Sequence, residues 1–219
     1  MPRGNRPTRA TRERILETAE LLFAEHGFYG VSLRELARAA NVNVAAVNYH
    51  FGDMKALYLD LLVRRFRALN SEWLASIEKL ASNSVPNNSL ADILAAMGRP
   101  LFEASLGADP GKERFVKLLS RCLTEPLDFA EPLLTQEYFS GLALFTRAIR
   151  QQVKELSPDE FMWRFSFVLG ALHHTLATLP RMEKLTDGIC RNNSQQNVMK
   201  RFVDFSVAAF LAPKSVVAT

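Results

Sequence analysis

The sequence predicts an all-α protein, and three observations support this class. Apolar residues recur every three or four positions through most of the chain, which is the period of a helix with one buried face. No stretch rich in Val, Ile and Thr alternates as a half-buried strand would. With 219 residues, of which 48% are hydrophobic and 23% are charged, the chain can bury a core without a metal or a disulfide.

We also expect the protein to be soluble and cytoplasmic. Its two cysteines, Cys122 and Cys190, exclude a disulfide-built secreted scaffold. The first residues lack the apolar core of a secretory signal, and no apolar run approaches the ~20 residues of a membrane span.

The first three helices are predicted to be short and closely joined. Residues 11–26 carry one apolar stripe, and a second helix begins at Ser32, whose side chain can cap it. Asn41 can adopt the left-handed backbone of a tight turn, and Asn43 can cap a third helix that runs through His50. Two short helices joined by a tight turn and braced by an apolar helix are typical of a helix-turn-helix module.

A long fourth helix is predicted to begin near Asp53 and to run through Leu80, joining two parts of the molecule. A polar loop is predicted for residues 81–89. Further helices are predicted at about residues 89–106, 112–124, 131–156, 158–179 and 193–211. We therefore divide the chain into a flexible basic arm (1–10), a helix-turn-helix domain (11–53), a helical C-terminal domain (54–212) and a tail (213–219).

The positive charge is concentrated in the first third of the chain. Residues 1–70 contain eleven Lys and Arg against seven Asp and Glu, whereas residues 71–219 contain sixteen of each. Arg3, Arg6, Arg9 and Arg12 lie in the first twelve residues, which contain no acid. This asymmetry is expected where one end of a protein contacts a polyanion, but a solvated basic tail explains the arm equally well.

The third predicted helix has side chains suited to reading DNA in the major groove. Asn48 can bond to adenine edges, and Ala45 and Ala46 can touch thymine methyl groups. Tyr49 and His50 can bond to phosphates.

Three motifs lie within residues 11–62: I-L-x-x-A-x-x-L-F-x-x-x-G-F from Ile15, L-x-x-L-A-x-x-A from Leu33 and V-N-Y-H-F-G-D from Val47. On these motifs the segment resembles the DNA-binding domain of TetR/AcrR-type one-component repressors. The resemblance implies DNA contacts by Ser32, Arg34, Asn43, Ala45, Ala46, Asn48, Tyr49, His50 and Lys55. Two positions depart from the family pattern. Asn41 stands where glycine is frequent. Met54 stands where the family usually has a phosphate-contacting lysine, so no phosphate contact is expected of Met54, and the neighbouring Lys55 is the candidate substitute.

The same resemblance implies a C-terminal dimer interface, which two-fold symmetric operators require. Helix 158–179 has almost no charged side, so we expect it to be buried nearly all round. A narrow face of this helix and a stripe on the last helix would form an intermolecular four-helix bundle, unless both serve the internal core. The residues are Ser166, Gly170, His173, Ala177, Val198, Phe202, Phe205 and Ala209.

The C-terminal region also holds eleven of the fifteen phenylalanines, which more often form a core than a ligand site. The fragments FVKLLSRCL, MWRFSFVLGAL and FLAP resemble the fatty-acid-responsive, PsrA-like members of the family, which implies a long-chain fatty acid or acyl-CoA effector. The candidate ligand residues are Phe102, Phe115, Leu118, Phe139 and Phe165. Arg114, Lys117 and Arg121 share one helical face that is either a solvated stripe or a partner for an acyl carboxylate.

We therefore expect a nucleoid-associated, homodimeric repressor that leaves a palindromic operator when a small apolar effector binds. No catalytic constellation, cofactor loop or metal-ligand set is present in the sequence, and no membrane partner is expected. Two alternatives stay open. One is a helical enzyme or carrier that only looks like a DNA-binding protein, and the other, motivated by Met54, is an adaptor that has lost DNA binding.

Overall fold

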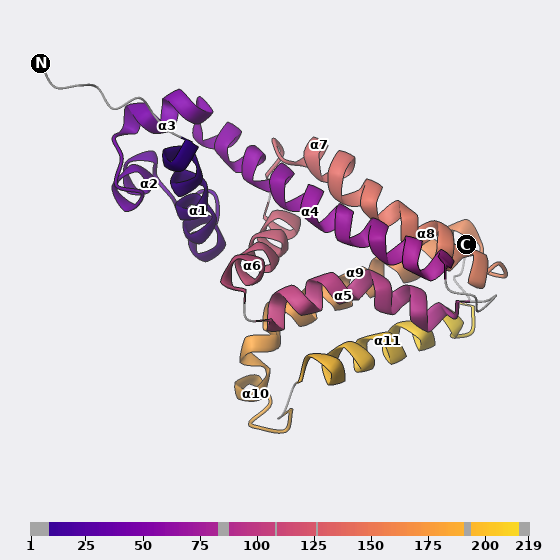
Figure 1. Cartoon of the computed structure of the whole chain (residues 1–219). Helices are drawn as coiled ribbons and strands as arrows, with labels where there is room; N and C mark the ends of the chain where they lie inside the picture. Colours follow the sequence, from indigo (N-terminus) through magenta and orange to yellow (C-terminus); the bar gives the residue numbers. More distant parts are fainter. Residues whose placement is uncertain (1–8, 83–87, 108, 126, 191–193, 215–219) are drawn as a thin grey trace, which may run out of the picture.

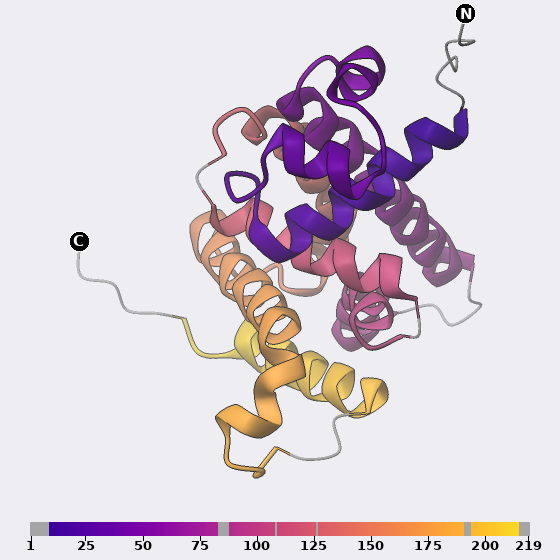
Figure 2. The same ribbon diagram turned by 90° about the vertical axis from the view of Figure 1, so that its left-hand side faces the viewer.

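The computed structural model describes residues 9–82, 88–107, 109–125, 127–190 and 194–214, and the elements in these ranges are all helical. The predicted all-α class is confirmed. Residues 1–8 of the basic arm and 215–219 of the tail lie outside the described residues. Figures 1 and 2 show a small N-terminal bundle at one end of the molecule and α10 and α11 at the other.

The N-terminal bundle contains α1 (Arg9–His26), α2 (Leu33–Ala39) and α3 (Val44–Phe51). Helices α2 and α3 begin where the sequence predicts, whereas α1 begins at Arg9, two residues earlier than predicted and within the expected arm. The Ser32 hydroxyl accepts a hydrogen bond from the Glu35 amide (3.2 Å), and the Asn43 side chain accepts one from the Ala46 amide (2.7 Å). Asn41 has φ = 51°, so the turn between α2 and α3 uses the left-handed conformation that asparagine tolerates.

Helix α4 (Met54–Ser82) has 29 residues and belongs to both parts of the molecule. Near its start, the ring of Tyr58 packs against Phe23 of α1, with centroids 5.1 Å apart. Further along, Trp73 packs against Phe145 of the C-terminal bundle at 5.8 Å. One hydrophobic core therefore runs along α4 and includes residues of both bundles.

The C-terminal bundle is built from helices α5 to α11. They are α5 (Leu90–Leu106), α6 (Pro110–Thr124), α7 (Glu131–Leu133), a π-helical turn (Leu134–Phe139), α8 (Ser140–Gln152), α9 (Pro158–Thr178), a 3-10 turn (Leu179–Arg181), α10 (Met182–Leu185) and α11 (Gln195–Leu211). In the described residues, no helix is long and apolar enough to cross a bilayer.

Several boundaries differ from the prediction. Helix α6 begins at Pro110 because Asp109 caps its first amides and proline fits the first helical position. The predicted helix 131–156 contains a π-helical turn and ends at Gln152. Helix α10 was not predicted, because four residues carry too little periodicity to be recognised.

The prediction that helix 158–179 is buried nearly all round was wrong. One side of α9 packs inside the chain, but Met162, Trp163 and Phe167 are 57%, 57% and 62% exposed. The buried side also includes Arg164, whose guanidinium group donates hydrogen bonds to Glu160 and to carbonyl groups at the end of α11. An apolar helix therefore presents one open face in the single chain.

Candidate nucleic-acid interface and effector pocket

One side of helix α3 packs against the N-terminal core, and its other side is exposed to solvent. Val47 is fully buried against the N-terminal core, whereas Tyr49 is 73% exposed. Asn43, Ala45 and Asn48 are also exposed, and Ala46 is half-buried. Because a helix of this kind can enter the major groove only with its outer side chains free, the geometry meets the first requirement for reading DNA.

His50 is placed less favourably for a phosphate contact. It is half-buried, and its ring lies between those of Tyr49 and Phe51, with centroid distances of 5.4 and 6.0 Å. Its Nε2 atom is shielded from solvent and has no hydrogen-bond partner among the described residues. The ring would have to turn before this nitrogen could bond to DNA.

Outside α3, the predicted contacts are mixed. Ser32 and Arg34 are exposed at the start of α2. Lys55 is exposed as well, but its ammonium group lies 5.4 Å from the centre of the Phe129 ring, which belongs to the C-terminal bundle. Met54 is half-buried and packs against the core. The structure therefore gives Lys55 a partner within the chain, which competes with a role as a phosphate ligand.

The N-terminal bundle is tied to the rest of the chain by charged side chains. Arg65 of α4 donates two hydrogen bonds to the buried carboxylate of Glu20 on α1, at 2.6 and 2.5 Å. Arg121 of α6 donates to the backbone carbonyls of Ala24 (3.0 Å) and Glu25 (2.7 Å) at the end of α1. Sequence reasoning missed this role of Arg121, because partners 96 and 97 residues away leave no local signal.

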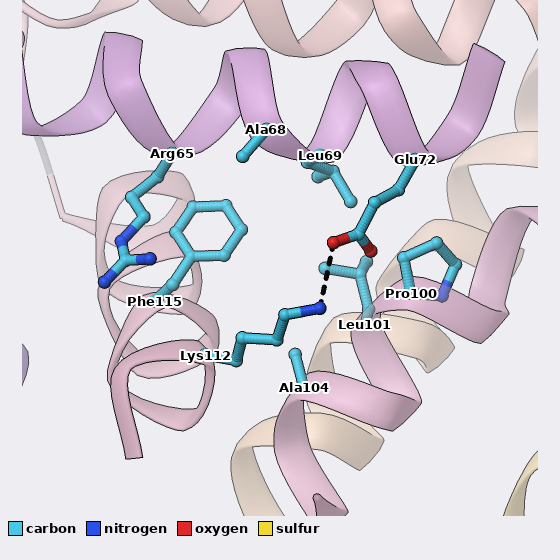
Figure 3. A pocket seen from close by; sticks show the side chains of 9 residues that line it. All are labelled: Arg65, Ala68, Leu69, Glu72, Pro100, Leu101, Ala104, Lys112 and Phe115. Carbon is cyan, nitrogen blue, oxygen red and sulfur yellow. Dashed lines mark hydrogen bonds and ion pairs between the residues drawn. The ribbon is translucent and has the colours of Figure 1, made fainter. Parts of the chain in front are cut away.

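A small pocket lies between α4, α5 and α6 (Figure 3). Its apolar wall contains Leu69, Leu101 and Phe115, and a Lys112–Glu72 ion pair of 2.9 Å spans it. The cavity volume of about 40 Å³ is far below the roughly 300–1,000 Å³ of a typical ligand site. This pocket must therefore widen before it can hold an acyl chain.

The five predicted ligand residues do not surround one cavity. Phe115 lines the pocket between α4, α5 and α6, whereas Phe102 and Leu118 are fully buried in the core. Phe139 and Phe165 instead line an open groove beside α8 and α9. The phenylalanine content of a segment predicts that it contributes to the core, but it does not predict which side chains line a cavity.

The residues predicted for a dimer interface divide into two groups. Ser166, Gly170 and Ala177 are exposed, Phe205 is 55% exposed and Ala209 is half-buried. Three others pack inside the chain and are therefore removed from the predicted interface. They are Val198, which is buried, Phe202, whose ring lies 5.5 Å from that of Phe102, and His173, whose Nε2 lies 2.6 Å from the Tyr138 hydroxyl.

The neutral form of His173 is favoured because its ring is desolvated. Burial lowers the pKa of His173 to about 4. Burial also raises the pKa of the Tyr138 hydroxyl, so the pair forms an uncharged hydrogen bond. No group of three or more His, Cys, Asp or Glu side chains in the described ranges could hold a metal ion.

Comparison with known proteins connects both bundles to one family. A family model described as "Tetracyclin repressor-like, C-terminal domain" matches residues 95–209, and one described as "Bacterial regulatory proteins, tetR family" matches residues 15–61. The proteins in these matches are regulators rather than enzymes.

Among curated relatives, the probable HTH-type transcriptional regulator YttP of Bacillus subtilis is 39% identical over 74 residues, or 34% of each chain. The HTH-type transcriptional repressor AcnR of Corynebacterium glutamicum is 43% identical over 58 residues, which cover 26% of this chain and 30% of the relative. The alignments thus span about a third of the length of these relatives.

Solved structures resemble the whole chain. A TetR-family transcriptional regulator from Bordetella parapertussis has a TM-score of 0.67 and 17% identity, and covers 97% of this chain and 100% of its own. The fatty acid degradation regulator FadR from Bacillus halodurans has a TM-score of 0.61 and 12% identity, with 94% and 98% covered. At such low identity, these likenesses support a common fold alone.

Proposed function

The chain belongs to the TetR family of bacterial regulatory proteins, and we propose that it is a dimeric transcriptional repressor whose operator affinity is controlled by a small effector. The observation that carries this proposal is the arrangement of α3, which is anchored by Val47 and exposes Asn48 and Tyr49 on its outer side. Binding to DNA would place the protein in the cytoplasm, at the nucleoid.

Base recognition is assigned to Asn48, with Ala45 and Ala46 against thymine methyl groups and Tyr49 on a phosphate. Replacing Asn48 and Tyr49 together by alanine should abolish sequence-specific binding, because both side chains are exposed and neither supports the core. The control is Asn197→Ala on α11, which removes an exposed asparagine far along the chain. Binding to DNA flanking the protein's own gene is measured by gel shift, and circular dichroism checks folding. Unchanged operator affinity in the double variant would overturn the assignment.

One observation favours a second candidate function, an adaptor that does not bind DNA. The family's usual lysine is replaced by Met54, and the neighbouring Lys55 lies over Phe129. The same gel shift separates the two functions, because an adaptor would leave every flanking fragment unshifted at low salt.

Dimerisation is assigned to the open face of α9, together with Phe205 of α11. Exposed apolar patches of this kind mark interaction surfaces, and a palindromic operator requires two copies related by a two-fold axis. The revised interface keeps the exposed residues of the prediction and adds Met162, Trp163 and Phe167.

Trp163→Asp with Phe167→Asp should convert the protein to a monomer, because two carboxylates cannot be desolvated in an apolar interface. Leu74→Asp on α4 is the control, since Leu74 is a 48% exposed leucine away from this face. Sedimentation equilibrium gives the mass. A dimer that persists in the double variant would remove α9 from the interface.

The effector is assigned to the pocket between α4, α5 and α6, where Phe115 and Leu101 would meet its apolar part. Lys112 would exchange its ion pair with Glu72 for one with an acidic end of the effector. A long-chain fatty acid or acyl-CoA fits this chemistry and the sequence resemblance. Binding would favour a conformer with a wider pocket, in which α4 and α6 move apart. Because Arg121 of α6 is hydrogen-bonded to the end of α1, this movement would also shift the DNA-binding bundle. Native mass spectrometry of the freshly purified protein should detect a co-purified amphipathic acid. A purely polar ligand would contradict this assignment.

A further inference from the structure

A polar cleft lies where α1, α4 and α6 meet, beside the effector pocket, with which it shares Arg65. Its volume is about 370 Å³, and these helices come together between the two bundles in Figure 1. The charged residues that line it are Glu17, Glu20, Arg64, Arg65, Asp109 and Arg114. We propose that this cleft binds a small oxyanion, either inorganic phosphate or a carboxylate, between Arg114 and Arg65.

Most charges in the cleft already have partners. Arg65 is paired with Glu20, and Arg64 donates to Glu13 at 2.5 Å. The Asp109 carboxylate accepts hydrogen bonds from the first amides of α6, at 2.8 and 3.3 Å. These contacts give partners to Glu20, Arg64, Arg65 and Asp109, but none of them involves Arg114.

Arg114 is the group that needs an acceptor. Its Nε atom is shielded from solvent and has no hydrogen-bond partner among the described residues. A buried N–H donor without an acceptor costs free energy, and an unseen ion or water is the usual explanation for one. The missing partner must accept hydrogen bonds, because a guanidinium group is a donor only.

The positions of the guanidinium groups favour an oxyanion as that partner. A methyl group placed on Gly111 would lie 3.2 Å from Arg65 Nη2, 3.2 Å from Asp109 Oδ1 and 3.7 Å from Arg114 Nη2, so two guanidinium groups and the Asp109 carboxylate meet beside the first turn of α6. Forked guanidinium groups bind phosphate and carboxylate oxygens in pairs. The resident ion pair of Arg65 with Glu20 can stay in place, since Arg114 supplies the free donors.

The test compares two variants of α6 that each remove one positive charge. Arg114→Gln changes the cleft, whereas Lys117→Gln removes an exposed lysine that pairs with Glu113 outside it. Sodium phosphate and sodium acetate are titrated separately at constant ionic strength, with chloride as the balancing salt. Binding is measured by calorimetry and by the shift in Tm.

We expect saturable binding of at least one of the two anions to the wild type and to Lys117→Gln, and at least tenfold weaker binding to Arg114→Gln. Phosphate alone identifies a tetrahedral ligand, and acetate identifies a carboxylate. Equal affinity in the wild type and Arg114→Gln, or no saturation in the wild type, would overturn the proposal. Arg114→Lys keeps the charge without the fork and should bind with intermediate affinity, which covers the case in which the glutamine variant does not fold.

Glu17 provides an independent check, because it is an exposed carboxylate on the rim of the same cleft. Its charge opposes an incoming anion, so Glu17→Gln should tighten binding of the anion that saturates the wild type. Weaker binding in this variant would overturn the assignment of the cleft to an anion. None of these readouts uses DNA, so their failure is distinct from failure of the proposed repressor function.

Discussion

Replacing Arg121 by methionine tests how the C-terminal bundle holds the DNA-binding bundle. The Arg121 guanidinium group reaches from α6 to the last turn of α1, where carbonyl groups lack partners within the helix. It donates to the carbonyls of Ala24 and Glu25 and also to the carboxylate of Glu125 at 2.8 Å. Methionine keeps much of the apolar stem but removes all three hydrogen bonds and the charge near the helix end.

The expected loss follows from these contacts. Hydrogen bonds from a charged group are worth about 1.5–3 kcal/mol each in mutational series. The Arg121 side chain is 36% exposed, so water replaces part of what is lost, and the bond to Glu125 on the same segment contributes little. We expect the free energy of unfolding to fall by about 1–3 kcal/mol in total.

Urea denaturation followed by circular dichroism measures this loss, with Arg121→Lys as the control that keeps the charge but not the fork. The lysine variant should fall between the wild type and Arg121→Met. If the effector acts through α6, the methionine variant should also show a weaker effect of effector on operator affinity. The reasoning is refuted if Arg121→Met unfolds at the same urea concentration as the wild type and with the same dependence of unfolding free energy on urea.

Four further predictions follow from packing and charge. The pKa of His173 is lowered to about 4 from 6.5 in the folded protein. As the pH falls, His173 is therefore protonated in the unfolded chain before it is protonated in the folded one. Stability should be complete above pH 6.5 and decline towards pH 4, and Tyr138→Phe should alter that profile in pH-dependent urea denaturation. Gly141→Ala places a methyl group 2.0 Å from Asn70 Oδ1 and should cost about 1–3 kcal/mol of stability by denaturation. Arg164→Met removes the buried donors to the end of α11 and should lower unfolding free energy by about 2–4 kcal/mol. Operator affinity should fall steeply with salt in fluorescence anisotropy, and a flat response would contradict phosphate contacts.

The DNA-binding bundle was the more predictable part of the chain. The capping roles of Ser32 and Asn43 involve amides three residues away, and the left-handed turn at Asn41 depends on that residue's own side chain. Such signals are local, so they can be recognised without knowing the fold. The exposed outer side of α3 follows in the same way, because burying Val47 turns the opposite residues outward.

The effector pocket was less predictable. Phe102 and Phe115 have the same side chain and both lie in apolar helices, yet only Phe115 borders the pocket. The ion pair of Lys112 with Glu72 joins residues 40 positions apart. Neither composition nor helical period contains information about such a distance.

The sequence by itself therefore determined the all-helical class, the order of the main helices and the position of the reading helix, because these depend on periodicity and on contacts within a turn or two. Only the tertiary structure decided which face of α9 stays open, that Arg121 binds the end of α1 and that Lys55 lies over Phe129. These outcomes depend on packing between helices that are distant in the chain, and side chains take their partners from whichever surface folding brings beside them.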